Sequence, residues 1–161
     1  MKPYKATGEL QLFRAYWMLS NRRSWLSDLP LREFSINYCA HMLNKKQFSH
    51  FRLYLGNLRL LSTLEHNLLD QNTEERRISY SEEVNNVSWD KIYTLQDELR
   101  VLYADTFPKK VGPMIMKYSQ EEVSEKIASL NRSYLDTLDW IPTEEKERVL
   151  RILISGEVQK R

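Results

Sequence analysis

Basic side chains in the first sixty residues are interleaved with aromatic rings, a combination that suits phosphate binding and base stacking. The cations are Arg22, Arg23, Lys45, Lys46, Arg52 and Arg59. The rings among them are Trp25, Phe48, Phe51 and Tyr54. Arginine and lysine neutralise phosphates, and aromatic rings stack on bases of any identity. Because the spacing of the rings matches apolar stripes, we assign the rings to the core and predict that the six cations bind nucleic acid.

Charge is distributed unevenly along the chain. Residues 1–60 contain ten Lys or Arg and three Asp or Glu, whereas residues 61–161 contain fourteen and nineteen, although the net charge is only +2. Such asymmetry can mark a basic face that binds DNA, RNA or a nucleoprotein complex. The competing explanation is that the basic and acidic segments pack beside each other.

Residue types that carry catalysis or bind metals occur without the spacing that either function needs. His41, His50 and His66 are not paired with another His, Cys or carboxylate at a metal-binding spacing, so we expect no metal and no cofactor. Cys39 lies in an amphipathic pattern and is predicted to be a buried, inert thiol in a reducing, cytoplasmic compartment. The sequence shows no glycine-rich phosphate loop, nucleophile elbow or paired-carboxylate site. These observations favour a non-catalytic regulatory or accessory protein.

One short segment supports a catalytic alternative. Six residues separate Arg59 from His66 in the segment RLLSTLEH, residues 59–66. This segment resembles the Arg-x4–6-His element of the HEPN family of helical ribonucleases. The resemblance implies that His66 moves a proton near neutral pH and that Arg59 stabilises charge on an RNA phosphodiester, usually across a dimer. The interpretation that we prefer is a surface arginine and a surface or capping histidine.

Length and composition predict a single domain, residues 1–161, made mostly of helices. A chain of 161 residues with 42% apolar and 29% charged residues can bury a core and is not of disordered composition. Only four glycines and five prolines are present, fewer than the many tight turns of a β-sandwich or barrel would use. We therefore predict an all-α bundle of five or six helices.

The basic helical half, residues 1–70, is predicted to contain three of these helices. The first spans about residues 8–22, and the second begins at Asp28, a good N-cap, and ends near Asn44. The third, near residues 46–70, is the longest and is predicted to be the central helix of the bundle.

This predicted central helix carries more apolar surface than one packing face requires. Its main stripe recurs at spacings of three and four from Phe48 to Leu68. A second face contains Leu53, Leu60 and Leu69. The main alternative function is therefore a protein–protein interaction module, as a homodimer or complex subunit that uses the second face.

A polar loop or linker is predicted at residues 71–87, ahead of an acidic helical half at residues 88–161. In that half, one helix should open at Ser88 and end before Pro108. Residues 119–122, SQEE, form the pattern of a capping box for the next helix. A last helix should begin at Thr143, after Pro142, and close at Gly156.

Two segments have the layout of a helix-turn-helix motif. In residues 118–135 the apolar stripe continues through the supposed turn, so one continuous helix is the better interpretation. Residues 35–51, with a turn at residues 44–46, lie in the basic half and are the stronger candidate for DNA binding. No apolar run reaches the roughly 18 to 20 residues that span a bilayer, and we expect no membrane partner.

Overall fold

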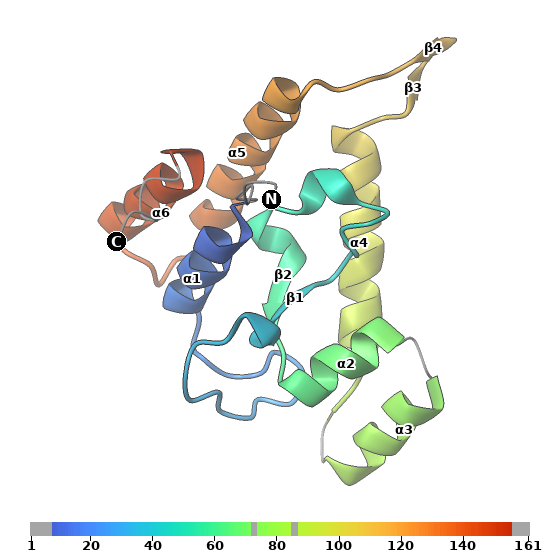
Figure 1. Ribbon diagram of the computed structural model, residues 1–161, viewed down its shortest axis with the longest axis vertical. Helices are drawn as coiled ribbons and strands as arrows, with labels where there is room; N and C mark the ends of the chain where they lie inside the picture. The colour runs from blue at the N-terminus through green and yellow to red at the C-terminus, as the bar shows by residue number, and fades with distance from the viewer. Residues whose placement is uncertain (1–7, 72–73, 85–86, 156–161) are drawn as a thin grey trace, which may run out of the picture.

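Helices dominate the fold, as the sequence predicts. The computed structural model describes residues 8–71, 74–84 and 87–155 (Figure 1). The six α-helices of these residues are α1 (Glu9–Leu19), α2 (Thr63–Gln71), α3 (Glu74–Glu83), α4 (Asp90–Thr106), α5 (Gln120–Asp136) and α6 (Thr143–Ser155). The described residues also form three short 3-10 helices and two antiparallel ribbons, β1 (Cys39–His41) with β2 (Leu58–Leu60) and β3 (Lys110–Val111) with β4 (Met114–Ile115). None of the described helices is both long enough and apolar enough to cross a membrane.

The long central helix predicted near residues 46–70 is absent, and this prediction was wrong. The segment contains two short 3-10 helices, Ser49–Phe51 and Leu55–Asn57, followed by β2, and becomes α-helical only at Thr63. Most of its apolar side chains are buried, by contacts on several sides of an irregular chain, but Leu64 of the predicted main stripe is 56% exposed. Apolar residues at intervals of three and four are therefore compatible with a buried, non-helical segment when other elements surround it.

Two buried asparagines supply the hydrogen bonds that a helix would have supplied to this segment. Asn57 accepts from the backbone N–H of Leu43 at 2.8 Å and donates to the carbonyl of Leu43 at 3.1 Å. Asn131 of α5 accepts from Leu55 N at 2.7 Å and donates to Leu53 O at 3.1 Å. Asparagine competes well with regular secondary structure because its side chain pairs with both backbone groups. These two residues fix the irregular segment against Leu43, two residues after β1, and against α5.

The second predicted helix, from Asp28 to about Asn44, is also absent. Asp28 has a φ of 62°, in the left-handed region, and does not cap a helix. The chain instead forms a 3-10 helix at Ile36–Tyr38 and then β1, which pairs with β2 so that Cys39 lies opposite Leu60. The helix-turn-helix candidate at residues 35–51 is therefore wrong, because this segment contains no α-helix.

The ribbon of β1 and β2 lies between two clusters of buried apolar side chains. Cys39 and Ala40 are successive residues of β1 and point to opposite faces of the ribbon, and each belongs to a different cluster. One cluster joins the ribbon to α1 and α6, and the other joins it to α2, α3 and α4. Burial of Cys39, which the sequence predicts, raises the pKa of its thiol to about 12.

The stretch at residues 71–87 is not the exposed loop that its polarity suggests, because most of it is α3. Two buried polar side chains hold this helix in place. Arg77 donates to the carbonyls of Leu68 and Leu69 at 2.9 and 2.7 Å, and so satisfies the last turn of α2. Tyr80 donates to Glu65 at 2.7 Å. A helix anchored by hydrogen bonds leaves no apolar stripe in the sequence.

The acidic half forms helices close to the predicted positions. The capping box at Ser119 is present, with Ser119 and Glu122 each bonded to the other's backbone N–H, and α5 continues as one helix through the second helix-turn-helix candidate. The preceding helix, α4, begins two residues after Ser88 and ends before Pro108. The last helix begins at Thr143 as predicted, while its predicted end at Gly156 lies outside the described residues.

Candidate functional site

A tight turn between α1 and β1 forms one side of a cavity of about 930 Å³. Arg22 and Asp28 take left-handed φ values of 59° and 62°, and Leu31 N donates to Arg22 O at 2.9 Å. Arg23 Nε donates to the carboxylate of Asp28 at 2.9 Å. A left-handed backbone costs a residue other than glycine roughly 1–3 kcal/mol, so the rest of the fold must hold this turn in place.

A buried carboxylate anchors the turn. Glu65 of α2 is fully buried, and its Oε1 accepts from Ser24 Oγ at 2.6 Å and from Ser62 N at 2.8 Å. Its Oε2 accepts from the hydroxyl of Tyr80 at 2.7 Å. Burial alone would raise the pKa of Glu65, but these hydrogen bonds outweigh burial and hold the pKa below its ordinary value of 4.5. The ionised carboxylate thus connects the turn, α2 and α3.

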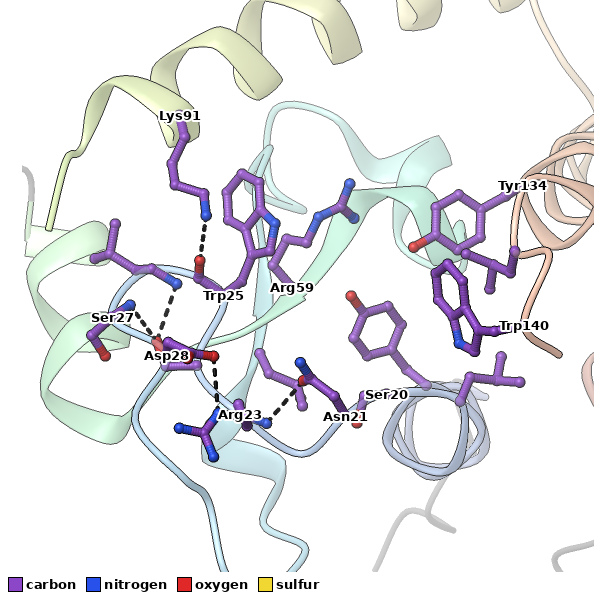
Figure 2. Close-up of a pocket in the computed structure, with 16 residues that line it drawn as sticks. Ser20, Asn21, Arg23, Trp25, Ser27, Asp28, Arg59, Lys91, Tyr134 and Trp140 are labelled. Carbon is purple, nitrogen blue, oxygen red and sulfur yellow. Dashed lines mark hydrogen bonds and ion pairs between the residues drawn. The ribbon is translucent and has the colours of Figure 1, made fainter. Parts of the chain in front are cut away.

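Arg59 lies between two aromatic rings in this cavity (Figure 2). From β2, its guanidinium carbon lies 5.2 Å from the ring centroid of Trp25 and 5.9 Å from that of Tyr134. Its Nη1 donates to the carbonyls of Gly56 and Leu58 at 3.1 and 2.6 Å. Since a guanidinium has five N–H donors, Arg59 can keep these contacts and still donate to an oxyanion.

Lys91 reaches the same indole from α4. Its Nζ lies 4.3 Å from the ring centroid of Trp25 and donates to the carbonyl of that residue at 2.6 Å. Burial lowers the pKa of Lys91, as does the charge of Arg59, while Asp28 acts in the opposite direction. Two cations from different elements therefore converge on Trp25, and each lowers the cost of bringing an anion there.

Two further rings line the cavity beside Arg59. Trp140, between α5 and α6, is 70% exposed, and Figure 2 shows it next to Tyr134. Tyr16 of α1 is half-buried, and burial raises the pKa of its phenol, as does its hydrogen bond with Tyr134, whereas Arg59 lowers it. The phenol is therefore neutral, and Trp140 offers the most accessible ring.

We call this site the aromatic–cationic pocket. Its charged and aromatic lining residues are Tyr16, Arg23, Trp25, Asp28, Arg59, Lys91, Tyr134 and Trp140. Asp28, the carboxylate among them, is paired with Arg23, so Arg59 and Lys91 give the pocket an excess of positive charge. The volume lies in the range of roughly 300–1,000 Å³ that is usual for ligand sites. Such a lining can hold a ligand that combines a planar ring with an anionic group.

The structure brings only two of the six predicted cations, Arg23 and Arg59, into this pocket. Arg22 lies outside the pocket lining, with its guanidinium 5.4 Å from the ring centroid of Trp17. Lys46 is exposed in the turn that precedes the 3-10 helix Ser49–Phe51. The predicted cations thus do not form one continuous site.

Of the remaining two predicted cations, Arg52 lines a separate cavity of about 580 Å³ together with His50. Lys45 forms an ion pair with Glu9 at 2.9 Å. Burial raises the pKa of Glu9, but Lys45, His41 and Arg52 together lower it below its ordinary value. Glu9 thus offsets the charge of Lys45, and Glu121 and Glu125 line the second cavity, which makes it the weaker anion site.

The two residues of the ribonuclease-like segment lie in different elements. Arg59 belongs to β2, and His66 belongs to α2, where its Nδ1 lies 2.7 Å from the carbonyl of Asn37 and its Nε2 lies 3.4 Å from Asp70. The single helix that would carry both residues is not formed. Ribonuclease activity stays a separate prediction, and an activity retained by His66→Ala would remove it.

The sequence interpretation missed Tyr16, Lys91, Tyr134 and Trp140 as pocket residues, and it assigned Trp25 to the core although that ring lines the pocket. Lys91 and Trp140 stand outside the apolar stripes of their segments, and no local pattern connects them with Trp25 or Arg59. The available signal was a tryptophan just before Pro142, in a segment with no helical periodicity, where a core role is least expected.

Within the described residues, no group of three His, Cys, Asp or Glu side chains could hold a metal ion. Searches with protein-family models, against curated proteins and against solved structures found no match to this chain. The functional argument therefore depends on the geometry of the aromatic–cationic pocket.

Proposed function

We propose that this protein is a non-catalytic nucleic-acid-binding protein that holds a single strand of DNA or RNA in the aromatic–cationic pocket. The observation that carries the proposal is the position of Arg59 and Lys91 beside four aromatic rings, one of which, Trp140, is 70% exposed. The cations would neutralise phosphates, and Trp140 would stack on a base.

The shape of the site favours a single strand over a duplex. Bases of a single strand are free to leave the stack and enter a pocket, whereas duplex bases are contacted through a helix or ribbon that enters a groove. The segment that was the better helix-turn-helix candidate, residues 35–51, contains no α-helix. The rings of the pocket come from α1, α5 and the loops beside them, and they line a cavity.

The proposal keeps the predicted regulatory or accessory role and moves the contact surface. The predicted surface used the basic half alone, whereas the pocket combines Arg23 and Arg59 from that half with Lys91 and Trp140 from the acidic half. We place the protein in the cytoplasm, where the single buried thiol of Cys39 would stay reduced.

The alternative of a protein-interaction module loses the surface on which it was based. The second apolar face of the predicted central helix was to be formed by Leu53, Leu60 and Leu69. Leu60 and Leu69 are 3% and 8% exposed, and Leu53 packs against both core clusters.

Fluorescence anisotropy with short labelled oligonucleotides tests the proposal. We expect saturable binding to single-stranded DNA or RNA, with weaker binding to duplexes of the same sequence. Between about 50 mM and about 200 mM salt the affinity should fall, with a slope of about −0.7 in log K against log salt for each phosphate neutralised. Separate DNA and RNA probes decide which nucleic acid binds more tightly.

The matched variants are Lys91→Gln and Lys46→Gln, which remove one exposed lysine inside the pocket and one outside it. Weaker binding for Lys91→Gln with unchanged binding for Lys46→Gln supports the pocket. Binding that responds instead to charge reversal at Lys45, Lys46 and Arg52 would assign nucleic acid to the other cations. The absence of any binding at low salt would remove the proposal.

A further inference from the structure

The ribbon of β3 and β4 is an arm that projects from the body of the molecule. In Figure 1 it extends beyond the ends of α4 and α5. Its two strands have two residues each, with Lys110 opposite Ile115 and Val111 opposite Met114. Gly112 has a φ of 61°, the positive value that a two-residue hairpin turn needs at this position.

The base of this arm is firmly held. The hydroxyl of Tyr118 donates to the carbonyl of Pro108 at 2.6 Å, which joins the two ends of the hairpin. The rings of Phe107 and Tyr118 meet edge to face at 5.2 Å, and Lys126 of α5 lies over both rings at 5.9 and 5.8 Å. An arm with a fixed base and a short turn presents its tip in a defined direction.

The tip, by contrast, exposes large apolar side chains. Val111, Met114 and Ile115 are 53%, 59% and 68% exposed. Val111 and Met114 are cross-strand partners on one face of the ribbon, while Ile115 lies on the other face, so both faces of the tip are apolar. Apolar groups on both faces suit an environment that surrounds the tip, not a partner that covers one side.

Lysines follow directly behind the apolar tip. Lys109, Lys110 and Lys117 are exposed, and residues 107–118 contain no Asp or Glu, although the acidic half around them has more carboxylates than cations. At about 3.3 Å per residue, the turn lies roughly 7–10 Å beyond Lys110. Segments that bind membrane interfaces bury apolar groups to a similar depth of about 5–10 Å, with lysines near the headgroups.

We propose that this hairpin inserts its apolar tip shallowly into a membrane surface that contains anionic lipids. Lys109, Lys110 and Lys117 contact the headgroups, while Val111, Met114 and Ile115 enter the boundary of the acyl region. The contact is peripheral. It revises the expectation of no membrane partner, which considered only spanning segments, and it does not depend on the function proposed for the pocket.

Two other partners fit the same arm less well. A nucleic-acid duplex lying along the hairpin would bring its phosphates toward exposed carboxylates at the base, among them Asp105, Glu121 and Glu122. A bilayer that meets the tip stays about the length of the hairpin away from these carboxylates. A second copy of the chain, docked tip to tip, would oppose two sets of three lysines.

Flotation with phosphatidylcholine vesicles, with and without phosphatidylserine, tests the proposal on the full chain. We expect the protein to float with the vesicles that contain phosphatidylserine and to stay behind with pure phosphatidylcholine. Replacing all three hairpin lysines by glutamine should lower the partition coefficient at least tenfold, since each lysine near an anionic surface contributes roughly fivefold. Ile115→Ser combined with Met114→Ser should lower it as well.

The controls use matched residues away from the arm. Val101→Ser alters an equally exposed apolar side chain on α4, and Lys46, Arg32 and Arg132, each changed to Gln, remove three exposed cations elsewhere. Both controls should float like the wild type, and circular dichroism should show that all variants are folded.

Three results would overturn the proposal. The first is a wild type that does not float with anionic vesicles, and the second is flotation that the hairpin variants do not reduce. The third concerns the variant with Met114→Ser and Ile115→Ser. If this variant still floats but loses duplex DNA binding or self-association, the arm would instead bind nucleic acid or a second copy of the chain.

Discussion

The aromatic–cationic pocket and the β3–β4 hairpin both combine cations with large apolar groups, but they arrange them in opposite ways. In the pocket, Arg59 and Lys91 lie over the ring of Trp25 and bond to backbone carbonyls. In the hairpin, three lysines and three aliphatic side chains are exposed around a ribbon of two short strands.

This difference indicates two kinds of ligand. A pocket with preorganised cations and rings suits a ligand with a defined shape, because little ordering is needed when it binds. An exposed tip suits a fluid surface that can adapt to it. If the two regions are independent, a change in one should leave the binding activity of the other intact, and the following predictions test that independence.

The largest effect, a loss of stability accompanied by weaker oligonucleotide binding, is expected for Glu65→Ala. Loss of the carboxylate leaves the hydroxyls of Ser24 and Tyr80 without their acceptor in a buried site. We expect destabilisation by about 3 kcal/mol, which for a chain of this size lowers the Tm by roughly 6–12 °C. Oligonucleotide binding should also weaken because Glu65 anchors the pocket turn, whereas vesicle flotation below the Tm should be unchanged. Thermal melting and both binding assays check this, and equal loss of the two activities would show that the regions are not independent.

The contribution of Glu65 should also depend on pH. Because its folded-state pKa lies below the ordinary value of 4.5, the ionised carboxylate stabilises the fold above that pH, and this stabilisation disappears as the pH falls through the folded-state pKa. The difference in Tm between wild type and Glu65→Gln should therefore narrow on acidification below about 4.5. A difference that stays constant down to the lowest pH at which the protein folds would contradict an ionised Glu65.

The next largest effect, on the affinity for a single strand, is expected for Trp140→Ala. Stacking of a base on an aromatic side chain contributes about 1–3 kcal/mol, so affinity for a single strand should fall roughly 5- to 150-fold. Stability should change little because the ring is 70% exposed. Trp140→Phe should retain most of the binding, which distinguishes loss of stacking from loss of a folded loop.

A smaller effect is expected for Lys91→Gln. The substitution removes one cation beside Trp25, so the salt dependence of single-strand binding should become shallower by about 0.7 in log K against log salt. Titrations at several salt concentrations measure this slope. An unchanged slope would mean that Lys91 contacts no phosphate.

The smallest effect on stability is expected for Ile115→Ser in the hairpin. This side chain is 68% exposed, so the free energy of unfolding should change by less than about 0.5 kcal/mol, and oligonucleotide binding should be unaffected. Chemical denaturation measures the first quantity. A large loss of stability would show that the tip packs against the fold and is not free for a membrane.

The success of the sequence interpretation differed between the two halves of the chain for a physical reason. In the acidic half, helix starts depend on local chemistry such as the capping box at Ser119 and the helix-opening pattern at Thr143, which can be recognised within a few residues. In the basic half, the backbone is held by distant side chains, as when Asn131 bonds to Leu55 across 76 positions. No periodicity within residues 46–62 contains that information.

The candidate site was predictable only in part for the same reason. The cationic character of Arg23 and Arg59 was recognised, but their position beside Lys91 and Trp140 depends on how β2, α4 and the loop before α6 meet. The prediction of a polar loop at residues 71–87 was wrong because polarity was taken as a sign of exposure. Arg77 and Tyr80 are polar side chains, but both are buried and anchor α3 to the core.

The most direct test of the proposed function is the intrinsic tryptophan fluorescence of the protein during titration with an unlabelled single strand at low salt. Stacking on Trp140 predicts saturable quenching in the wild type, which should be largely lost in Trp140→Phe while anisotropy still reports binding by that variant. Two results would contradict the assignment of the nucleic-acid site to the aromatic–cationic pocket. The first is binding by the wild type without quenching. The second is quenching that persists unchanged in Trp140→Phe and weakens only when cations outside the pocket are removed.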